Sequence, residues 1–136
     1  MYLIDTNVIS EARRNTKEAV SWLRSVDPLS IYLSVITLGE IARGIGLKRR
    51  YDPGAATRLT EWLQKLRHDH ADRILPIIDQ IAVEWGRLSA LRPRGDADGL
   101  IAATAIVHDL IIVTRNVADF DDAEVSVINP WDARDD

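Results

Sequence analysis

The chain has 136 residues, a formal net charge of −4, 46% hydrophobic residues and no cysteine. This length and composition predict one domain, residues 1–136, and the lack of cysteine excludes disulfides, thiolate metal sites and cysteine nucleophiles. No apolar run approaches the roughly 20 residues of a membrane span and the N-terminus lacks a signal-peptide pattern, so we expect a cytoplasmic protein without a membrane partner.

The net negative charge by itself argues against a nucleic-acid partner, because such partners usually meet a basic surface. The two signs are segregated along the chain, however, with basic residues gathered in the middle third and acidic residues in the last forty. Arg43 and the run Lys48, Arg49 and Arg50 belong to the basic region. A run of this kind is most often a solvated face, and a phosphate-binding surface is the alternative.

The stretch from Tyr2 to Ile4 is short and apolar, and an Asp-Thr-Asn cluster follows it at Asp5. This pattern predicts a buried parallel strand with a loop or a helix start at its carboxyl end. In open α/β sheets that end is where ligands bind. Asp5 is therefore either a solvated turn residue or the first member of a site.

A helix over about 16–26 and a second strand over 31–35 follow, which together predict a βαβ unit and a parallel sheet. The residues from Thr37 to Glu40 match a capping box, in which the Thr hydroxyl and the Glu carboxylate satisfy backbone amides. Glu40 is therefore either a helix cap or an acid at the same sheet edge as Asp5.

Two amphipathic helices over about 37–47 and 55–70 predict an antiparallel helical hairpin in the middle third. A short or edge strand over 74–78 comes next, because Pro76 cannot donate a hydrogen bond to a strand ladder. We expect Asp79 to cap the helix that follows.

Two acids, Asp96 and Asp98, precede a segment over 100–107 that is small or apolar on every face. Such a segment predicts a helix buried in the centre of the domain. One acid at a helix start is commonly a cap that complements the helix dipole. Two acids one residue apart exceed what a cap requires.

A further buried strand is predicted over 110–113, and polar residues including Asn116 and Asp119 follow its carboxyl end. A last strand is expected over 125–128. The tail beyond Trp131 should be frayed.

These predictions place four acids at one sheet edge: Asp5, Glu40, Asp98 and Asp119. Carboxylates held together raise one another's pKa, which is unfavourable unless a cation neutralises them. Oxygen ligands without a cysteine or histidine cluster suit Mg²⁺ or Mn²⁺, which can activate a water and neutralise charge on a phosphate. The pattern indicates a metal-dependent phosphodiesterase, although a phospho-receiver or a small phosphatase shares this arrangement.

Four motifs carry a resemblance to a known family: IDTNVIS, SVITLGEIARG, DGLIAATA and TRNVADF. They resemble, in the same order, the motifs of PIN-domain nucleases, specifically the VapC-type toxins of bacterial toxin-antitoxin modules in their FitB-like branch. The resemblance extends over nearly the whole chain. It implies a three-layer α/β/α sandwich around a parallel sheet, Mg²⁺- or Mn²⁺-dependent endoribonuclease activity, inhibition by a cognate antitoxin, and a homodimer.

The resemblance also assigns roles to individual residues. Asp5, Glu40 and Asp98 match the three central acids of the family and Asp119 matches the fourth acidic position. By this resemblance Asp5 and Asp98 hold the metal, while Glu40 and Asp119 bind it directly or through water.

By the same resemblance, Thr6 and Thr114 occupy positions where hydroxyl groups orient carboxylates or waters, and Asn116 is a supporting residue at a nearby polar position where some members carry Asp. Asp96 has no firm counterpart and is interpreted as a cap or a supporting group. Since an acidic cleft repels RNA, basic residues beside it should bind the phosphates, and the candidates are Arg43, Lys48, Arg49 and Arg50.

Two other classes of function stay open. A PIN-like domain that has lost activity would serve as an RNA- or DNA-binding or interaction module, although the presence of all four acids argues against this. A phospho-receiver would carry a lysine just after a late strand, where this chain has only Arg115.

Overall fold

The structure is a computed structural model that describes residues 1–120 and 124–132. Five parallel strands form one sheet in the order β3-β2-β1-β4-β5. Their bounds are Tyr2–Ile4 (β1), Ile31–Ser34 (β2), Ile74–Leu75 (β3), Ile111–Val113 (β4) and Val127–Ile128 (β5). The expected parallel sheet is therefore confirmed. Strand β3, which ends just before Pro76, lies at the edge of the sheet, as predicted.

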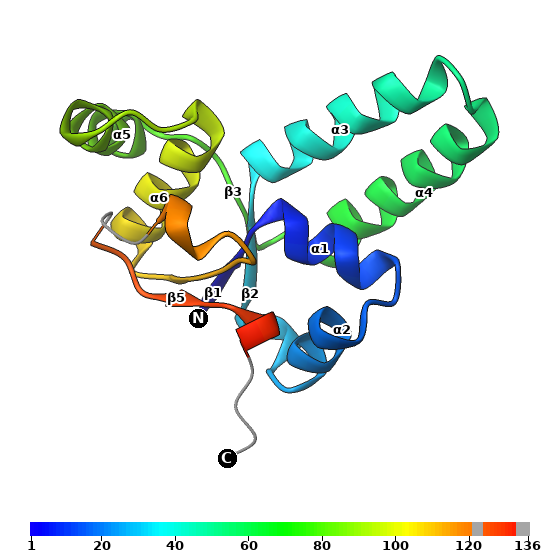
Figure 1. The fold of residues 1–136 in the computed structure, drawn as a ribbon, viewed down its shortest axis with the longest axis horizontal. Helices are drawn as coiled ribbons and strands as arrows, with labels where there is room; N and C mark the ends of the chain where they lie inside the picture. The colour runs from blue at the N-terminus through cyan, green and yellow to red at the C-terminus, as the bar shows by residue number, and fades with distance from the viewer. Residues whose placement is uncertain (121–123, 133–136) are drawn as a thin grey trace.

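Helices cover both faces of this sheet, which confirms the three-layer α/β/α fold (Figure 1). Their bounds are Thr6–Arg13 (α1), Lys17–Arg24 (α2), Val35–Arg49 (α3), Pro53–Asp69 (α4), Asp79–Leu91 (α5) and Asp96–His108 (α6), with short 3₁₀ turns at Pro28–Ser30 (η1), Val117–Asp119 (η2) and Pro130–Asp132 (η3). In the described residues, no helix is both long and apolar enough to cross a bilayer. The expectation of a frayed tail falls mostly on residues 133–136, outside the described residues.

Each face of the sheet has its own apolar core, because successive side chains of a strand point to opposite faces. Leu3 packs with the buried residues of α5 and α6, whereas Ile4 packs with those of α1, α3 and α4. Helix α6 is buried over most of its length, as its apolar sequence predicted. Gly99 allows α6 to approach α5, since a Cβ at this position would lie 2.9 Å from Trp85 Cδ1.

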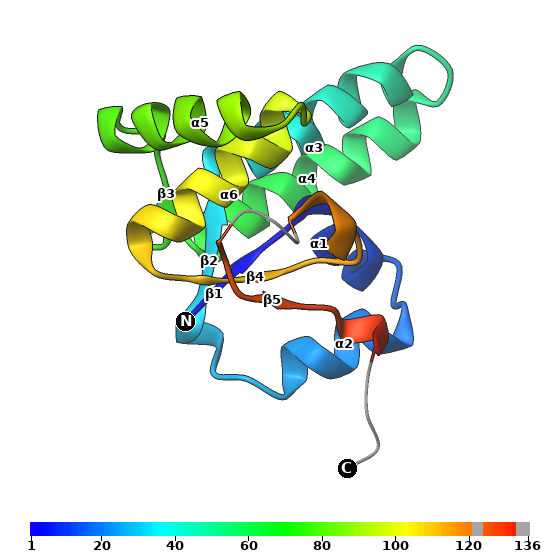
Figure 2. The same cartoon turned by 60° about the vertical axis from the view of Figure 1, so that its left-hand side comes forward.

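Helices α3 and α4 run antiparallel beside each other and project from the sheet, so the predicted helical hairpin is confirmed (Figures 1 and 2). Helix α3 continues through the Gly-Ile-Gly segment at 44–46 and ends at Arg49. Both helices are longer than the sequence predicted, since helix-compatible residues flank the periodic apolar positions.

Two local predictions about helix starts were wrong. Asp79 does not cap α5, because it is the first helical residue and the N-cap position is Ile78, which has no side-chain oxygen. Helix α1 was not predicted as an element, because the sequence allowed either a loop or a helix start after β1. Only Val8 and Ile9 are fully buried in α1, which explains its weak apolar pattern.

Candidate active site

The carboxyl ends of β1, β2 and β4 meet at one edge of the sheet, and α1 and α3 start directly from this edge (Figure 1). Strand β1 is the centre of the sheet, with β2 and β4 as its parallel neighbours. The residue that follows β1 is Asp5, and its backbone N–H donates to the Val113 carbonyl of β4 at 2.9 Å. The parallel topology thus brings residues that are far apart in the sequence to one place.

Asp5 is the N-cap of α1 and only 5% of it is exposed. Its Oδ1 accepts a hydrogen bond from the Thr6 backbone N–H at 2.8 Å, and its Oδ2 accepts from the Thr114 hydroxyl at 2.8 Å. Burial raises the pKa of Asp5, and the nearby carboxylates of Glu40 and Asp119 raise it further, while the two hydrogen bonds lower it. The carboxylate is held in one orientation in a place that is unfavourable for its charge.

Glu40 reaches the same place from α3. The Thr6 hydroxyl donates to Glu40 Oε1 at 2.6 Å, so Thr6 touches both carboxylates, one through its backbone and one through its side chain. The hydroxyl of Thr37, a fully buried residue, lies 3.3 Å from that of Thr6. The predicted supporting role of Thr6 therefore has a geometric basis.

The capping box predicted at Thr37 and Glu40 is wrong. Helix α3 begins at Val35, directly after β2, and its N-cap is Ser34, whose hydroxyl accepts from the Ile36 backbone N–H at 3.0 Å. Glu40 lies in the second turn, where the backbone amides are already bonded within the helix. The cap interpretation of Glu40 is therefore excluded.

Asp98 lies in the first turn of α6, two positions after Asp96, and Gly95 occupies the N-cap position. Asp98 is half-buried, and its pKa is raised to about 6, first by desolvation and then by the negative charges of Asp119, Asp5 and Glu40. Asp96 is exposed and occupies the first position of α6. It lies at the helix start, as expected, but not at the N-cap.

Asp119 lies in η2 and is half-buried. The fully buried Phe120 anchors this turn, and the Arg92 guanidinium donates to the Asp119 carbonyl at 3.2 Å. The charge of Asp119 raises the pKa of both Asp5 and Asp98, so the fourth acid lies beside the other three. All four predicted acids converge on one edge of the sheet.

Thr114 is the junction of a small polar network. Its hydroxyl donates to Asp5 and accepts from the Asn116 backbone N–H at 3.0 Å. Asn116, which was predicted as a supporting residue, therefore contacts Thr114 through its main chain. Sequence reasoning missed Asn7, whose amide lies 3.2 Å from both Asp5 Oδ2 and Thr114 Oγ1 and whose Oδ1 accepts from the Arg115 backbone N–H.

The four acids supply only oxygen donors, which is the chemistry that Mg²⁺ and Mn²⁺ prefer. Within residues 1–120 and 124–132, no three Asp, Glu, His or Cys side chains already stand in a ligating arrangement. Burial raises the pKa of Asp5 and Asp98 most and the neighbouring carboxylates raise it further, so a positive charge would be favourable at this edge. The donor set and its charge therefore fit a divalent cation.

The basic residues predicted to bind RNA do not share one surface. Lys48 lines a groove of about 500 Å³ that also contains Thr6 and Glu40. The other three candidates are exposed residues outside the lining of this groove, and the Arg49 guanidinium donates to the Thr60 hydroxyl at 3.3 Å. Of the predicted RNA-binding residues, only Lys48 lines the groove that also contains Glu40.

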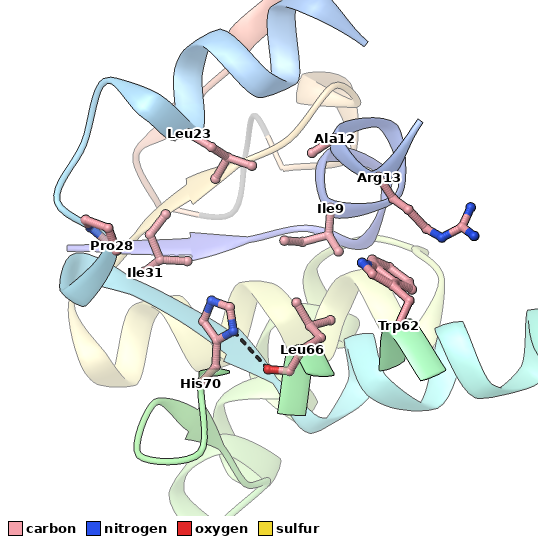
Figure 3. Close-up of a pocket in the computed structure, with 9 residues that line it drawn as sticks. All are labelled: Ile9, Ala12, Arg13, Leu23, Pro28, Ile31, Trp62, Leu66 and His70. Atoms are coloured by element: carbon pink, nitrogen blue, oxygen red, sulfur yellow. Dashed lines mark hydrogen bonds between the residues drawn. The ribbon is translucent and has the colours of Figure 1, made fainter. Parts of the chain in front are cut away.

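A second cavity, of about 340 Å³, lies between α1, α2 and α4 and is mostly apolar (Figure 3). Its lining residues are Ile9, Ala12, Arg13, Leu23, Pro28, Ile31, Trp62, Leu66 and His70. None of the four acids lines it. This cavity is therefore separate from the acidic edge.

Comparisons with known proteins agree with this geometry. The family model that describes the PIN domain matches residues 2–125. Toxin FitB of Neisseria gonorrhoeae is 37% identical over 96% of this chain and 99% of its own length, and VapC ribonuclease Y4jK of Sinorhizobium fredii is 31% identical over 97% and 99%.

Solved structures give the same picture. The crystal structure of FitAcB from Neisseria gonorrhoeae matches with a TM-score of 0.88 and 35% identity, covering 98% of this chain and all of the matched chain. A toxin-antitoxin complex from Klebsiella pneumoniae matches with a TM-score of 0.73 and 27% identity, covering 96% and 98%. The likeness extends over nearly the whole chain.

Proposed function

This chain belongs to the PIN domain family, and from that membership we propose that it is a metal-dependent endoribonuclease toxin that a cognate antitoxin restrains. The observation that carries the proposal is the convergence of four carboxylates at the carboxyl edge of a parallel sheet. Uncompensated charge of this kind has no structural benefit, because it destabilises the fold. Binding of a cation accounts for it.

We assign the binding of Mg²⁺ or Mn²⁺ to Asp5 and Asp98, with Glu40 and Asp119 as further ligands, directly or through water. When bound, such an ion supplies a water of lowered pKa and neutralises charge that develops on a phosphate. Asp5 is oriented by Thr6 and Thr114, and neither of its oxygens is free to turn without breaking a hydrogen bond.

The neighbouring residues position the other acids. Thr6 holds one oxygen of Glu40, which fixes the direction from which this carboxylate approaches the site. Asn7 links the ends of β1 and β4 through Asp5, Thr114 and the backbone of Arg115. Support of this kind typically changes metal affinity or activity by about 10- to 100-fold.

The phospho-receiver alternative loses its one cationic candidate. The Arg115 guanidinium lies 4.7 Å from the centre of the Trp131 ring, where it stacks on the aromatic face. A receiver needs a cation directed at the phosphoryl group on the strand-end Asp. The position of Arg115 therefore favours hydrolysis of a phosphodiester over phosphoryl transfer to Asp5.

We further propose that the protein acts in the cytoplasm as a homodimer, with RNA as its substrate and an antitoxin as its partner. Similar proteins support the partner, because one of the matched structures is a toxin-antitoxin complex and a matched relative is a toxin. The ribonuclease name of another relative supports the substrate.

Purified protein should cleave total cellular RNA when Mg²⁺ or Mn²⁺ is present and should stop when EDTA is added. The reason is that the four acids cannot approach a phosphate without a cation to neutralise them. Gel analysis of the RNA checks this result. Cleavage that continues in EDTA, or no cleavage with either metal, would contradict the proposal.

Glu40→Gln should lower RNA cleavage by more than about tenfold and leave the melting temperature nearly unchanged, because Gln keeps an acceptor for Thr6 but lacks the charge. Ser34→Ala is the matched control, since it removes the true N-cap of α3. It should cost about 1 kcal/mol of stability and preserve cleavage. A Glu40→Gln protein that melts earlier yet cleaves normally would reverse the assignment.

A further inference from the structure

The groove beside Glu40 runs between α1, α3 and α4, which lie next to one another in Figures 1 and 2. Thr6 and Glu40 are among its lining residues, so the groove shares Glu40 with the acidic edge. Four cationic side chains from three helices line the rest: Arg13, Arg14, Lys48 and Arg58. Glu40 is the only acid among its lining residues.

Most of this positive charge is not neutralised by a carboxylate. Arg14 pairs with Glu11 at 2.8 Å. Among the residues that the structure describes, Arg13, Lys48 and Arg58 form no ion pair. Arg13 and Arg58 are exposed and Lys48 is half-buried, so all three can meet a ligand in the groove.

Two of these cations are held in place by aromatic rings. The Arg13 guanidinium lies 5.6 Å from the centre of the Trp62 ring, and Lys48 Nζ lies 5.4 Å from that of Tyr51. Figure 3 shows Arg13 extending outward past Trp62. Arg13 and Trp62 line both the groove and the apolar cavity, so these two residues form the wall between them.

We propose that this groove binds the RNA strand that flanks the scissile phosphate, with Arg13, Lys48 and Arg58 on successive phosphates. The inference rests on the proposed ribonuclease function and names the residues that hold its substrate. A polyanion is repelled by the four acids, so its attraction must come from cations directly beside them. Three uncompensated cations in a groove that ends at Glu40 meet this requirement.

Most of the basic run in the sequence lies outside the lining of this groove. Residues Glu40, Ile41, Gly44, Ile45 and Lys48 of α3 share the groove face, following the helical period. Arg43 and Arg50 lie off this face. The cations proposed to bind phosphates therefore come from three helices, although the basic run in the sequence lies at the end of α3 alone.

The test compares two triple variants that remove the same charge. The groove variant is Arg13→Gln, Lys48→Gln and Arg58→Gln, and the control is Arg43→Gln, Arg49→Gln and Arg50→Gln. Binding of a fluorescent single-stranded RNA is measured by anisotropy across a salt series in EDTA, so that no cleavage occurs. Each phosphate contact contributes a slope of about 0.7 in log affinity against log salt.

The groove variant should bind more weakly, with a salt slope reduced by about 2, which corresponds to three lost phosphate contacts. The control should change the slope by less than one contact. Equal slope changes in the two variants, or an unchanged slope in the groove variant, would overturn the proposal. If the groove triple does not fold, Arg58→Gln alone decides, since Arg58 is exposed and should account for one contact.

A competitor separates RNA from an acidic protein as the occupant. Poly-glutamate of matched charge should displace the RNA poorly, and equal displacement would overturn the proposal in favour of an acidic peptide. Cleavage by the wild-type protein distinguishes the two failures. A protein that cleaves RNA but shows no groove dependence refutes the groove alone, whereas groove-dependent binding without cleavage refutes the catalytic proposal and supports the groove.

Discussion

Asp98→Asn should abolish metal-dependent RNA cleavage, with a loss greater than the roughly 10- to 100-fold that supporting residues contribute. Asn has the same shape as Asp but lacks the charge that binds a divalent cation. Asp98 is the best position for this test, because Gly95 holds the N-cap position of α6 and Asp98 is not the helix cap. Cleavage of RNA under single-turnover conditions measures the effect.

Asp96→Asn is the matched control for Asp98→Asn. Both acids lie in the first turn of α6, so each substitution removes one negative charge from the same helix terminus. Asp96 is exposed, however, and the carboxylates that raise the pKa of Asp5 and Asp98 are those of the other acids at the sheet edge. We expect Asp96→Asn to cleave normally. Similar losses in the two variants would mean that the helix terminus, rather than a metal ligand, is responsible.

Asp5→Asn should also abolish cleavage, but it is a less selective test. The Asn amide nitrogen would face one of two donors, the Thr6 backbone N–H or the Thr114 hydroxyl. An unsatisfied buried donor costs about 1 to 3 kcal/mol. Loss of cleavage in Asp5→Asn therefore mixes the missing charge with a destabilised strand end, which the melting temperature would report.

The arrangement of the acids was predictable because it follows from topology. Each of Asp5, Glu40 and Asp119 comes soon after an apolar strand, and parallel strands place their carboxyl ends at one edge. The alternation of strands and helices identified that sheet. Resemblance to PIN-domain motifs then separated the site residues from ordinary turn and cap residues.

The start of α3 was not predictable in the same way, because the strand passes into the helix without a loop. A capping box at Thr37 and Glu40 and a cap at Ser34 are both compatible with the sequence. In the structure, Ser34 is both the buried last residue of β2 and the N-cap of α3. A local sequence motif does not show that one residue ends a strand and also caps the next helix.

The basic track and the role of Asn7 depend on distances between elements far apart in the chain. Arg13 and Arg58 are separated in sequence from Lys48, and only the packing of α1 and α4 against α3 brings them together. Asn7 bonds to Thr114, more than one hundred residues away. The Asp-Thr-Asn cluster after β1 was the available signal for Asn7, since a polar residue two positions after a strand-end acid can reach the neighbouring strand.

The burial of Asp98 and the repulsion from its neighbouring acids also predict how metal and pH affect stability. The pKa of Asp98 is about 6 in the folded chain, above its usual value of 3.8. Between these pH values the folded state binds more protons than the unfolded state, so the free energy of unfolding falls as pH rises through this window. Two pH units would correspond to about 3 kcal/mol, which solvent screening at a half-buried side chain reduces to about 1 to 2 kcal/mol.

Mg²⁺ should therefore raise the melting temperature of the wild-type protein above about pH 6, where Asp98 is ionised. At 100 times its dissociation constant the ion contributes about 2.7 kcal/mol, which corresponds to roughly 5 to 10 °C for a domain of this size. At about pH 5 the shift should be smaller, because protons compete with the metal for the carboxylates.

Asp98→Asn should change both quantities, and in opposite directions. Without metal it should melt later than the wild-type protein at neutral pH, because one of four repelling charges is gone. With Mg²⁺ it should gain less, because one ligand is gone. Thermal melts at constant ionic strength, with Asp96→Asn beside it, measure both effects. Equal Mg²⁺-induced shifts in Asp98→Asn and the wild-type protein would mean that Asp98 is not part of the metal site. A gain in stability without metal in Asp98→Asn, but not in Asp96→Asn, would mean that the charge of Asp98 is one of the repelling charges.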